Sequence, residues 1–252
     1  MIEEFLANGF VALRGAVDRD ALSGCVAALE AELRANGVEP GDRSTWTRPV
    51  VRFNCPWGPP FAAAAKSPAV RAACDALLGA GAWIERDSVG GTVPVRFPHD
   101  ADPGDAGWRI DGSYDVGGQW WVNVHSRERG LLALYLFSDV DERSAPTEVL
   151  VGSHRDVPRV LAPHGERGAF FGEVARALPA STFERPRAQA TGRAGDVFLC
   201  HPFLVHRATW PHRGDAPRMV AQPGVALRAP FALTDRAGAC AVERAIIDAL
   251  AP

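Results

Sequence analysis

The feature that most constrains the fold is a series of short β-like segments that fills most of the chain after residue 80. Apolar and β-branched runs alternate there with turns rich in Gly, Pro and Asp. Such runs are typical of strands joined by tight turns. We predict strands at 82–85, 92–97, 108–111, 120–124, 131–137, 148–151, 197–200, 204–209 and 219–222. Many short strands after a helical start predict a barrel or jelly roll braced by helices.

The first third of the chain carries the helical signals. Apolar residues recur at helical spacing from Ala21 to Leu33, with Asp18 or Asp20 as the N-cap and Asn36-Gly37 as the end. A short helix and a strand at 10–13 precede this segment, and Pro68 begins a second helix that reaches about residue 78. Residues 38–66 read as irregular, and residues 235–250 as a closing helix. Residues 155–190, with four prolines, read as an insertion of the kind that carries lids or binding loops.

Composition narrows the class of protein. The 252 residues suit one β-rich domain over 1–252, and 47% are hydrophobic, enough for a core. A net charge of −3 gives no basic face for nucleic acid, and no apolar run is long enough to cross a membrane. The acidic N-terminus lacks the pattern of a signal peptide. Five scattered cysteines favour a reducing cytoplasm over a disulfide framework.

The most informative stretch runs from Gly195 to Arg218. A turn at Gly195-Asp196 leads into an apolar strand that ends in histidines, and Arg218 follows His206 by 12 residues. A hairpin folded at 211–214 would bring Arg218 beside His206. An imidazole can bind a metal ion that in turn binds one end of a dicarboxylate, while a guanidinium binds the far carboxylate. This pairing predicts a site for a small acid.

Here the chain resembles the phytanoyl-CoA dioxygenase-like branch of the iron(II)/2-oxoglutarate oxygenases. The matching segments follow the family's order over about residues 90–225, and they are 107–113, 145–147, 151–154 and the His206 to Arg218 block. The resemblance implies a double-stranded β-helix, a jelly roll of the cupin type, as a single domain over 1–252. It also implies iron(II) and 2-oxoglutarate as cofactors and the oxidation of a small organic substrate.

The resemblance also assigns roles to residues. It places the metal-binding carboxylate on Asp111, the distal metal-binding histidine on His206 and the 2-oxoglutarate arginine on Arg218. Thr147 is a candidate hydrogen-bond donor to the co-substrate. The family's first two ligands form a His-x-Asp on one strand, where residues i and i+2 share a face. The implied catalytic set is therefore residue 109 with Asp111 and His206.

Residue 109 is the departure from that pattern, because Arg109 stands where the first histidine should be. A guanidinium has no lone pair to offer a metal. At about 4 Å and an effective dielectric near 20, it would repel a dication by about 8 kcal/mol. Arg109 must therefore turn away, weaken iron binding, or itself replace the ion by neutralising Asp111.

Other histidines are weaker candidates. His99, in a loop ten residues before Arg109, could complete the metal shell. His201 competes with His206, but its distance from Arg218 fits the family less well. His154, after Gly-Ser, reads as a turn residue. The tryptophans at 108, 120 and 121 read as core or as pocket walls.

Two hypotheses follow. The first is an iron(II)/2-oxoglutarate oxygenase of specialised metabolism, cytoplasmic, monomeric or homodimeric, with iron at Asp111 and His206. The second is a metal-independent member of the same fold, in which Arg109 and Arg218 bind an anion or serve a non-oxidative reaction.

Overall fold

Two antiparallel sheets face each other and form the double-stranded β-helix of this protein, in a computed structural model that describes residues 1–251. The larger sheet runs in the order β1-β11-β7-β14-β3, and β13 also pairs with β7. The smaller sheet runs β10-β8-β12. The strands of the two sheets are β1 Phe10–Leu13, β3 Trp83–Ile84, β7 Leu131–Leu136, β8 Glu148–Leu150, β10 Arg187–Gln189, β11 Val197–Cys200, β12 His206–Arg207, β13 Val220–Ala221 and β14 Gly224–Leu227.

Period-two alternation along β7 sends its side chains to two different cores. Leu132, Leu134 and Leu136 point between the sheets, where Phe198 of β11 and Val149 of β8 meet them. Ala133 and Tyr135 belong to the larger core on the opposite face, which the helices cover. The space between the two sheets is where a site in this fold can be built from both.

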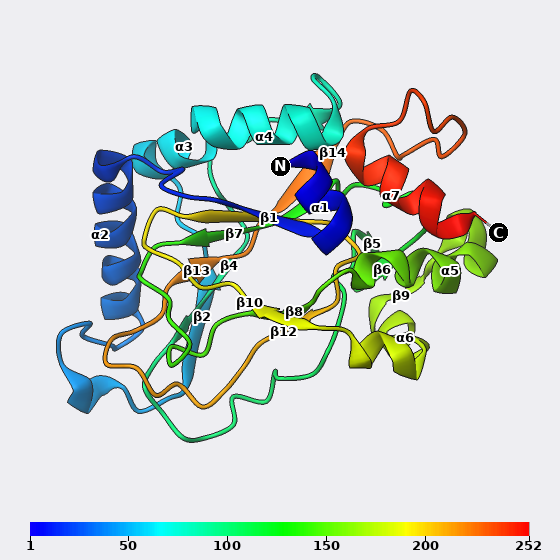
Figure 1. Cartoon of the computed structure of the whole chain (residues 1–252). Coiled ribbons are helices and arrows are strands. Elements are labelled where there is room, and N and C mark those ends of the chain that lie inside the picture. The colour runs from blue at the N-terminus through cyan, green and yellow to red at the C-terminus, as the bar shows by residue number, and fades with distance from the viewer. Residues whose placement is uncertain (252) are drawn as a thin grey trace.

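The helices lie on the outside of the strands (Figure 1). Figure 1 shows α3 and α4 along one side of the molecule and α5, α6 and α7 gathered at the other end. Asp18 caps the long helix α2 by accepting from the backbone N–H groups of Asp20 and Ala21. The helices are α1 Ile2–Asn8, α2 Arg19–Ala35, α3 Pro59–Ala65, α4 Pro68–Leu78, α5 Val157–Leu161, α6 Phe171–Arg176 and α7 Ala241–Leu250. No helix within residues 1–251 combines the length and apolar character that a membrane span requires.

Two segments expected to be irregular contain ordered elements. Residues 38–66 contain α3 and β2 Val50–Asn54, which pairs with β4 Thr92–Arg96. Residues 155–190 contain α5, α6 and β9 Ala169–Phe170, which pairs with β6 Gln119–Val122, the partner of β5 Tyr114–Val116. Residue 187 begins β10, so the insertion is attached to both the smaller sheet and the β5-β6 hairpin. Strand partners distant in sequence stabilise these elements, which is why local composition did not reveal them.

The strand expected at 108–111 does not form. Only Arg109 of this segment pairs with another chain segment, through an isolated antiparallel bridge to His206. The remaining expected strands are present. The strand at 197–200 keeps its bounds as β11, and the others are shorter, with β12 and β13 reduced to two residues each. The closing helix also begins later than expected, at Ala241.

Candidate functional site

Asp111 and His206 come together at the edge of the smaller sheet. The backbones of His206 and Arg109 exchange two hydrogen bonds of 2.9 Å, which fixes β12 against the segment that carries Asp111. The Asp111 carboxylate Oδ1 lies 3.5 Å from His206 Nε2. Both side chains are largely withdrawn from solvent, with 28% and 9% of their surfaces exposed. The structure thus brings together the two expected metal-binding residues.

The orientation of the His206 ring follows from its other nitrogen. Nδ1 lies 3.0 Å from the carbonyl oxygen of Leu204, and a carbonyl can only accept, so Nδ1 carries the proton. In the neutral imidazole, Nε2 then presents a lone pair toward Asp111. Two acceptors that face each other require a cation between them, either a metal ion or a proton on Nε2. A histidine oriented through its far N–H by a backbone carbonyl is also how metal-binding histidines are held.

Arg129 is a member of the site that the sequence reading missed. Its Nη1 lies 2.7 Å from Asp111 Oδ2, the carboxylate oxygen that does not face His206. The preceding loop is strained, since Ser126 and Glu128 have φ of 44° and 69°. Buried Ser126 holds that loop by donating from its hydroxyl to the Arg129 carbonyl at 2.7 Å. A lone loop arginine carries no periodic or motif signal, so only the fold reveals it.

Arg109 does not bind Asp111. Its Nη1 donates to the carbonyl oxygen of Asp105 at 2.8 Å, and no ion pair joins it to Asp111 among the described residues. The expectation that residues 109 and 111 share a strand face is therefore wrong, because the segment is not a strand. Burial alone would raise the pKa of Asp111, but His206, Arg129 and the more distant Arg109 together lower it. Asp111 is thus held as an anion.

The residues present fit part of an iron site. Within residues 1–251 no cluster of three His, Cys, Asp or Glu side chains has the arrangement of a metal site. His99 does not supply a third, because its Nδ1 accepts from the Ala101 N–H and its backbone pairs with His212. Asp111 Oδ1 and His206 Nε2 nevertheless offer one oxygen and one nitrogen to a single ion. Arg129 on Oδ2 restricts Asp111 to one ligating oxygen.

Arg218 lies in the interior. It is 1% exposed, and its Nη1 donates to the carbonyl oxygen of Ala145 at 2.6 Å. Ala145 has a φ of 51°, a strained conformation for a residue with a Cβ, in the segment that leads to buried Thr147. Burial and the nearby Arg96 lower the pKa of Arg218 to about 9. A guanidinium this deeply buried requires an anionic or polar partner.

The hairpin expected to join His206 to Arg218 does not form. The chain leaves the smaller sheet after β12 and enters the larger sheet at β13, so His206 pairs with Val149 while Arg218 pairs with Arg96. Asp105 links the two halves of the site instead. Its carbonyl accepts from Arg109, and its carboxylate accepts from Arg96 Nη2 at 2.6 Å.

The two other histidines weighed from the sequence lie elsewhere. The rings of His154 and His201 contact each other at a tilt of 43°, with centroids 4.9 Å apart, and both residues are buried. Both nitrogens of His154 lack a hydrogen-bond partner among the described residues. His201 accepts from the Phe203 N–H through Nδ1. This pair belongs to the packing under α7 and not to the Asp111 site, which supports the choice of His206 over His201.

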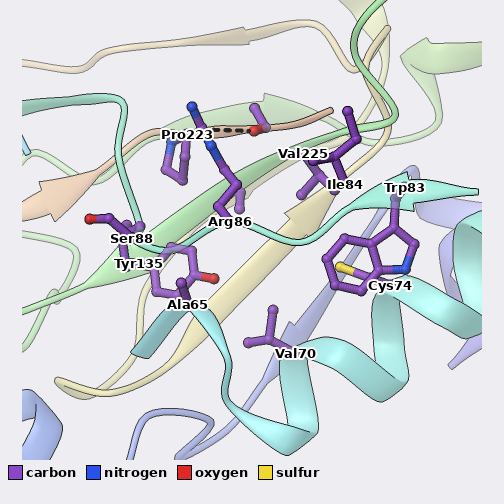
Figure 2. A pocket seen from close by; sticks show the side chains of 13 residues that line it. Ala65, Val70, Cys74, Trp83, Ile84, Arg86, Ser88, Tyr135, Pro223 and Val225 are labelled. Atoms are coloured by element: carbon purple, nitrogen blue, oxygen red, sulfur yellow. Dashed lines mark hydrogen bonds between the residues drawn. The ribbon is translucent and has the colours of Figure 1, made fainter. Parts of the chain in front are cut away.

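Two further features lie away from Asp111. Trp108, considered as a pocket wall, lies under the guanidinium of Arg207, whose Cζ is 4.4 Å from the ring centroid. An apolar cavity of about 30 Å³ lies between α4, β3 and the outer face of β7. Figure 2 shows Tyr135, Cys74 and Trp83 around it, with Arg86 bonded to the Gly224 carbonyl at 3.2 Å. This cavity faces the helices and not the space between the sheets.

Comparison with known proteins agrees with this architecture. The family model described as phytanoyl-CoA dioxygenase matches residues 5–220. The carbocyclase SnoK from nogalamycin biosynthesis superposes with a TM-score of 0.55 at 18% identity, over 90% of this chain and 82% of that one. HygX from Streptomyces hygroscopicus, solved with nickel and 2-oxoglutarate, gives 0.56 at 17% identity, over 89% and 84%.

A third similar structure is AviO1 from Streptomyces viridochromogenes Tue57, with a TM-score of 0.55 at 17% identity over 91% of this chain and 94% of that one. At these identities the superpositions establish the fold. No sequence among the curated proteins matches the chain.

Proposed function

Because the chain belongs to the phytanoyl-CoA dioxygenase family, we propose that it is an iron(II)/2-oxoglutarate-dependent oxygenase in which two residues, Asp111 and His206, hold the ion. The observation that carries the proposal is the pair of acceptors, Asp111 Oδ1 and His206 Nε2, that face each other at 3.5 Å. The Arg109 guanidinium is bonded to the Asp105 carbonyl oxygen and forms no ion pair with Asp111 among the described residues.

Different residues of the chain position the metal ligands and bind the co-substrate. Arg129 fixes the Asp111 carboxylate through Oδ2, and the Leu204 carbonyl fixes the His206 ring. Arg218 binds the far carboxylate of 2-oxoglutarate, and the hydroxyl of Thr147 donates a hydrogen bond to the same molecule. When bound at this site, iron(II) and 2-oxoglutarate would supply the activation of dioxygen, which is the oxidant, with succinate and CO₂ as co-products. The surrounding chain orients the substrate and excludes water.

We further propose a small organic substrate of specialised metabolism. The support is that HygX is described with hygromycin B bound and SnoK belongs to nogalamycin biosynthesis. In this chain, the β5-β6 hairpin presents a half-exposed Trp120 next to Gly112, where a Cβ would lie 2.5 Å from the Trp120 Cβ. This broad apolar side chain beside Asp111 suits an organic ring system.

One observation favours a second function, which is anion binding or a non-oxidative reaction without metal. Asp111 already has the Arg129 guanidinium at 2.7 Å. A proton on His206 Nε2 would complete the neutralisation of Asp111 without an ion. In that case Arg129, and not Arg109, takes the place of the metal.

Anaerobic reconstitution tests the two functions against each other. The protein is first supplied with iron(II) and 2-oxoglutarate without oxygen, and bound iron is measured. Dioxygen is then admitted and released succinate is measured, for the natural chain and for Arg109→His. We expect near-stoichiometric iron and succinate release in both proteins. If only Arg109→His binds iron and releases succinate, the oxygenase function is wrong for the natural chain and the metal-free function stands.

A further inference from the structure

A pair of buried arginines on facing strands is the least expected feature of the interior. Arg96 at the end of β4 and Arg218 before β13 form an antiparallel bridge, with backbone hydrogen bonds of 3.0 and 2.8 Å in the two directions. Residues directly opposite each other in such a pair extend their side chains to the same side of the sheet. Arg96 is 2% exposed and Arg218 1%. Like charges placed opposite each other destabilise a sheet, and burial increases the cost.

The described residues compensate only part of this charge. Asp105 is the one carboxylate bonded to the pair, and it contacts Arg96 but not Arg218. The same Asp105 oxygen also accepts from Arg52, whose side chain is 42% exposed. Two buried cations therefore share a single anion, part of whose charge is already used by a third arginine.

Unsatisfied polar atoms collect at the same place. Three nitrogens, Arg96 Nε, Arg218 Nε and His212 Nε2, and one oxygen, Asp105 Oδ1, are buried with no hydrogen-bond partner within residues 1–251. Arg96, His212 and Ala145, but not Arg218, line a small cavity of about 10 Å³, room for about one water-sized group. Such atoms are rarely left unpaired in a folded protein, and the excess of nitrogens over the single oxygen indicates a further acceptor that binds there.

We infer that Arg96 is a second carboxylate-binding arginine, so that Arg96 and Arg218 together hold the far carboxylate of the dicarboxylate co-substrate. This inference rests on the proposed function for the identity of the acid. A carboxylate has two oxygens with room for several donors, so two guanidiniums can share it. Its negative charge removes the repulsion between them. Arg96 thereby makes the site selective for an acid with a second carboxylate.

The test compares acids and variants by calorimetry. The acids are 2-oxoglutarate and 2-oxobutyrate, which carries the same 2-oxo acid group but lacks the far carboxylate. The variants are Arg96→Met, Arg96→Lys and the matched control Arg52→Met, which removes the exposed partner of the same Asp105 oxygen. Binding is measured on metal-free protein and on protein supplied with Mn(II), so no reading depends on turnover.

We expect Arg96→Met to weaken 2-oxoglutarate binding by at least about tenfold, because a charge-assisted hydrogen bond is lost. Arg96→Lys keeps the positive charge without the planar guanidinium, so its 2-oxoglutarate affinity should lie between those of the natural chain and Arg96→Met. Arg52→Met should stay within about twofold, and 2-oxobutyrate affinity should be the same in every variant. If Arg96→Met does not fold, Arg96→Lys carries the same comparison.

Three results would overturn the inference. They are unchanged 2-oxoglutarate affinity in both Arg96 variants, an equal loss for both acids, and natural protein that binds neither acid. Failure of the proposed function looks different. Protein that binds 2-oxoglutarate through Arg96 but releases no succinate with iron retains the two-arginine site and loses the oxygenase reaction.

Discussion

The two regions of the proposed site call for ligands of opposite charge. Around Asp111 and His206, two acceptors face each other across 3.5 Å and require a cation. Around Arg96 and Arg218, two paired guanidiniums face the interior with unpartnered Nε atoms and require an anion. A metal ion chelated by a dicarboxylate supplies both charges in one ligand. Under the proposed function, the two regions are complementary to the two ends of such a ligand, and two residues, Asp111 and His206, would hold the ion.

The two regions also differ in how many protein contacts hold their charged side chains. Asp111 has a guanidinium on one oxygen, and a strained loop positions that guanidinium. The side chain of Arg218 has only the Ala145 carbonyl as a hydrogen-bond partner among the described residues. Protein contacts therefore fix the Asp111 carboxylate before any ligand binds, whereas the positive charge of Arg218 relies on a ligand for its compensation.

The largest effect expected is from Asp111→Asn, which removes the anionic ligand and leaves the fold of the segment intact. Iron affinity should fall by more than about 100-fold, beyond the 10-fold to 100-fold cost typical of losing a partner of a ligand. Anaerobic equilibrium dialysis of iron(II) measures it. Asp100→Asn, at a side chain that is 83% exposed, is the control and should bind iron as the natural chain does. Equal affinities in all three proteins would remove Asp111 from the metal site.

Arg129→Met distinguishes the two roles proposed for Arg129 beside Asp111. If Arg129 orients a metal ligand, its loss should lower iron affinity by about tenfold, since the Asp111 carboxylate loses its 2.7 Å partner. A rise in iron affinity would instead indicate that Arg129 stands in for the ion. Arg127→Met is the matched control, because Arg127 lies in the same loop and pairs with Glu128 on the surface.

The buried His154–His201 pair gives a prediction about the stability of the protein at low pH. Burial lowers the pKa of His154 to about 3 and that of His201 well below its ordinary value, with Arg155 adding to the effect at His154. The unfolded chain protonates each imidazole below about pH 6.5, while the folded chain keeps them neutral. The unfolded state therefore binds more protons as the pH falls, and stability decreases.

Below pH 6 the free energy of unfolding should fall by about 1.4 kcal/mol per pH unit for each histidine of this pair. Carboxylates with lowered pKa add their own loss only near and below pH 4. Urea unfolding at pH 7, 6 and 5 measures the slope. His154→Phe should make it shallower, and His164→Gln, at an exposed histidine, should not. A slope that His154→Phe leaves unchanged would show that this pair is not the origin of acid sensitivity.

The smallest effect concerns Thr147, the candidate donor to the co-substrate. Thr147→Val keeps the volume and removes the hydroxyl, which corresponds to one neutral hydrogen bond of about 1 kcal/mol. The KM for 2-oxoglutarate should rise by about fivefold, with kcat nearly unchanged. Thr182→Val is the control, since its hydroxyl is committed to Asp156 Oδ2 at 2.8 Å. If Thr147→Val matches the natural chain, the contact does not exist.

The sequence by itself determined the elements whose signals are local. Apolar spacing with Pro68 at the start predicted a helix to about residue 78, and α4 spans Pro68–Leu78. The turn at Gly195-Asp196 and its apolar run predicted the strand that became β11, with the same bounds. The resemblance carried by the motifs predicted the family and the fold, and it named Asp111 and His206, which do meet.

Tertiary structure alone decided which charges lie together. Arg109 and Asp111 are two residues apart, yet their side chains diverge because the segment forms one bridge to β12 and no strand. Arg129 reaches Asp111 across 18 residues, and Arg96 faces Arg218 across 122. Such pairings depend on which strands become neighbours in the two sheets. Periodicity shows which face of an element is buried, but it carries no information about the partner across the barrel.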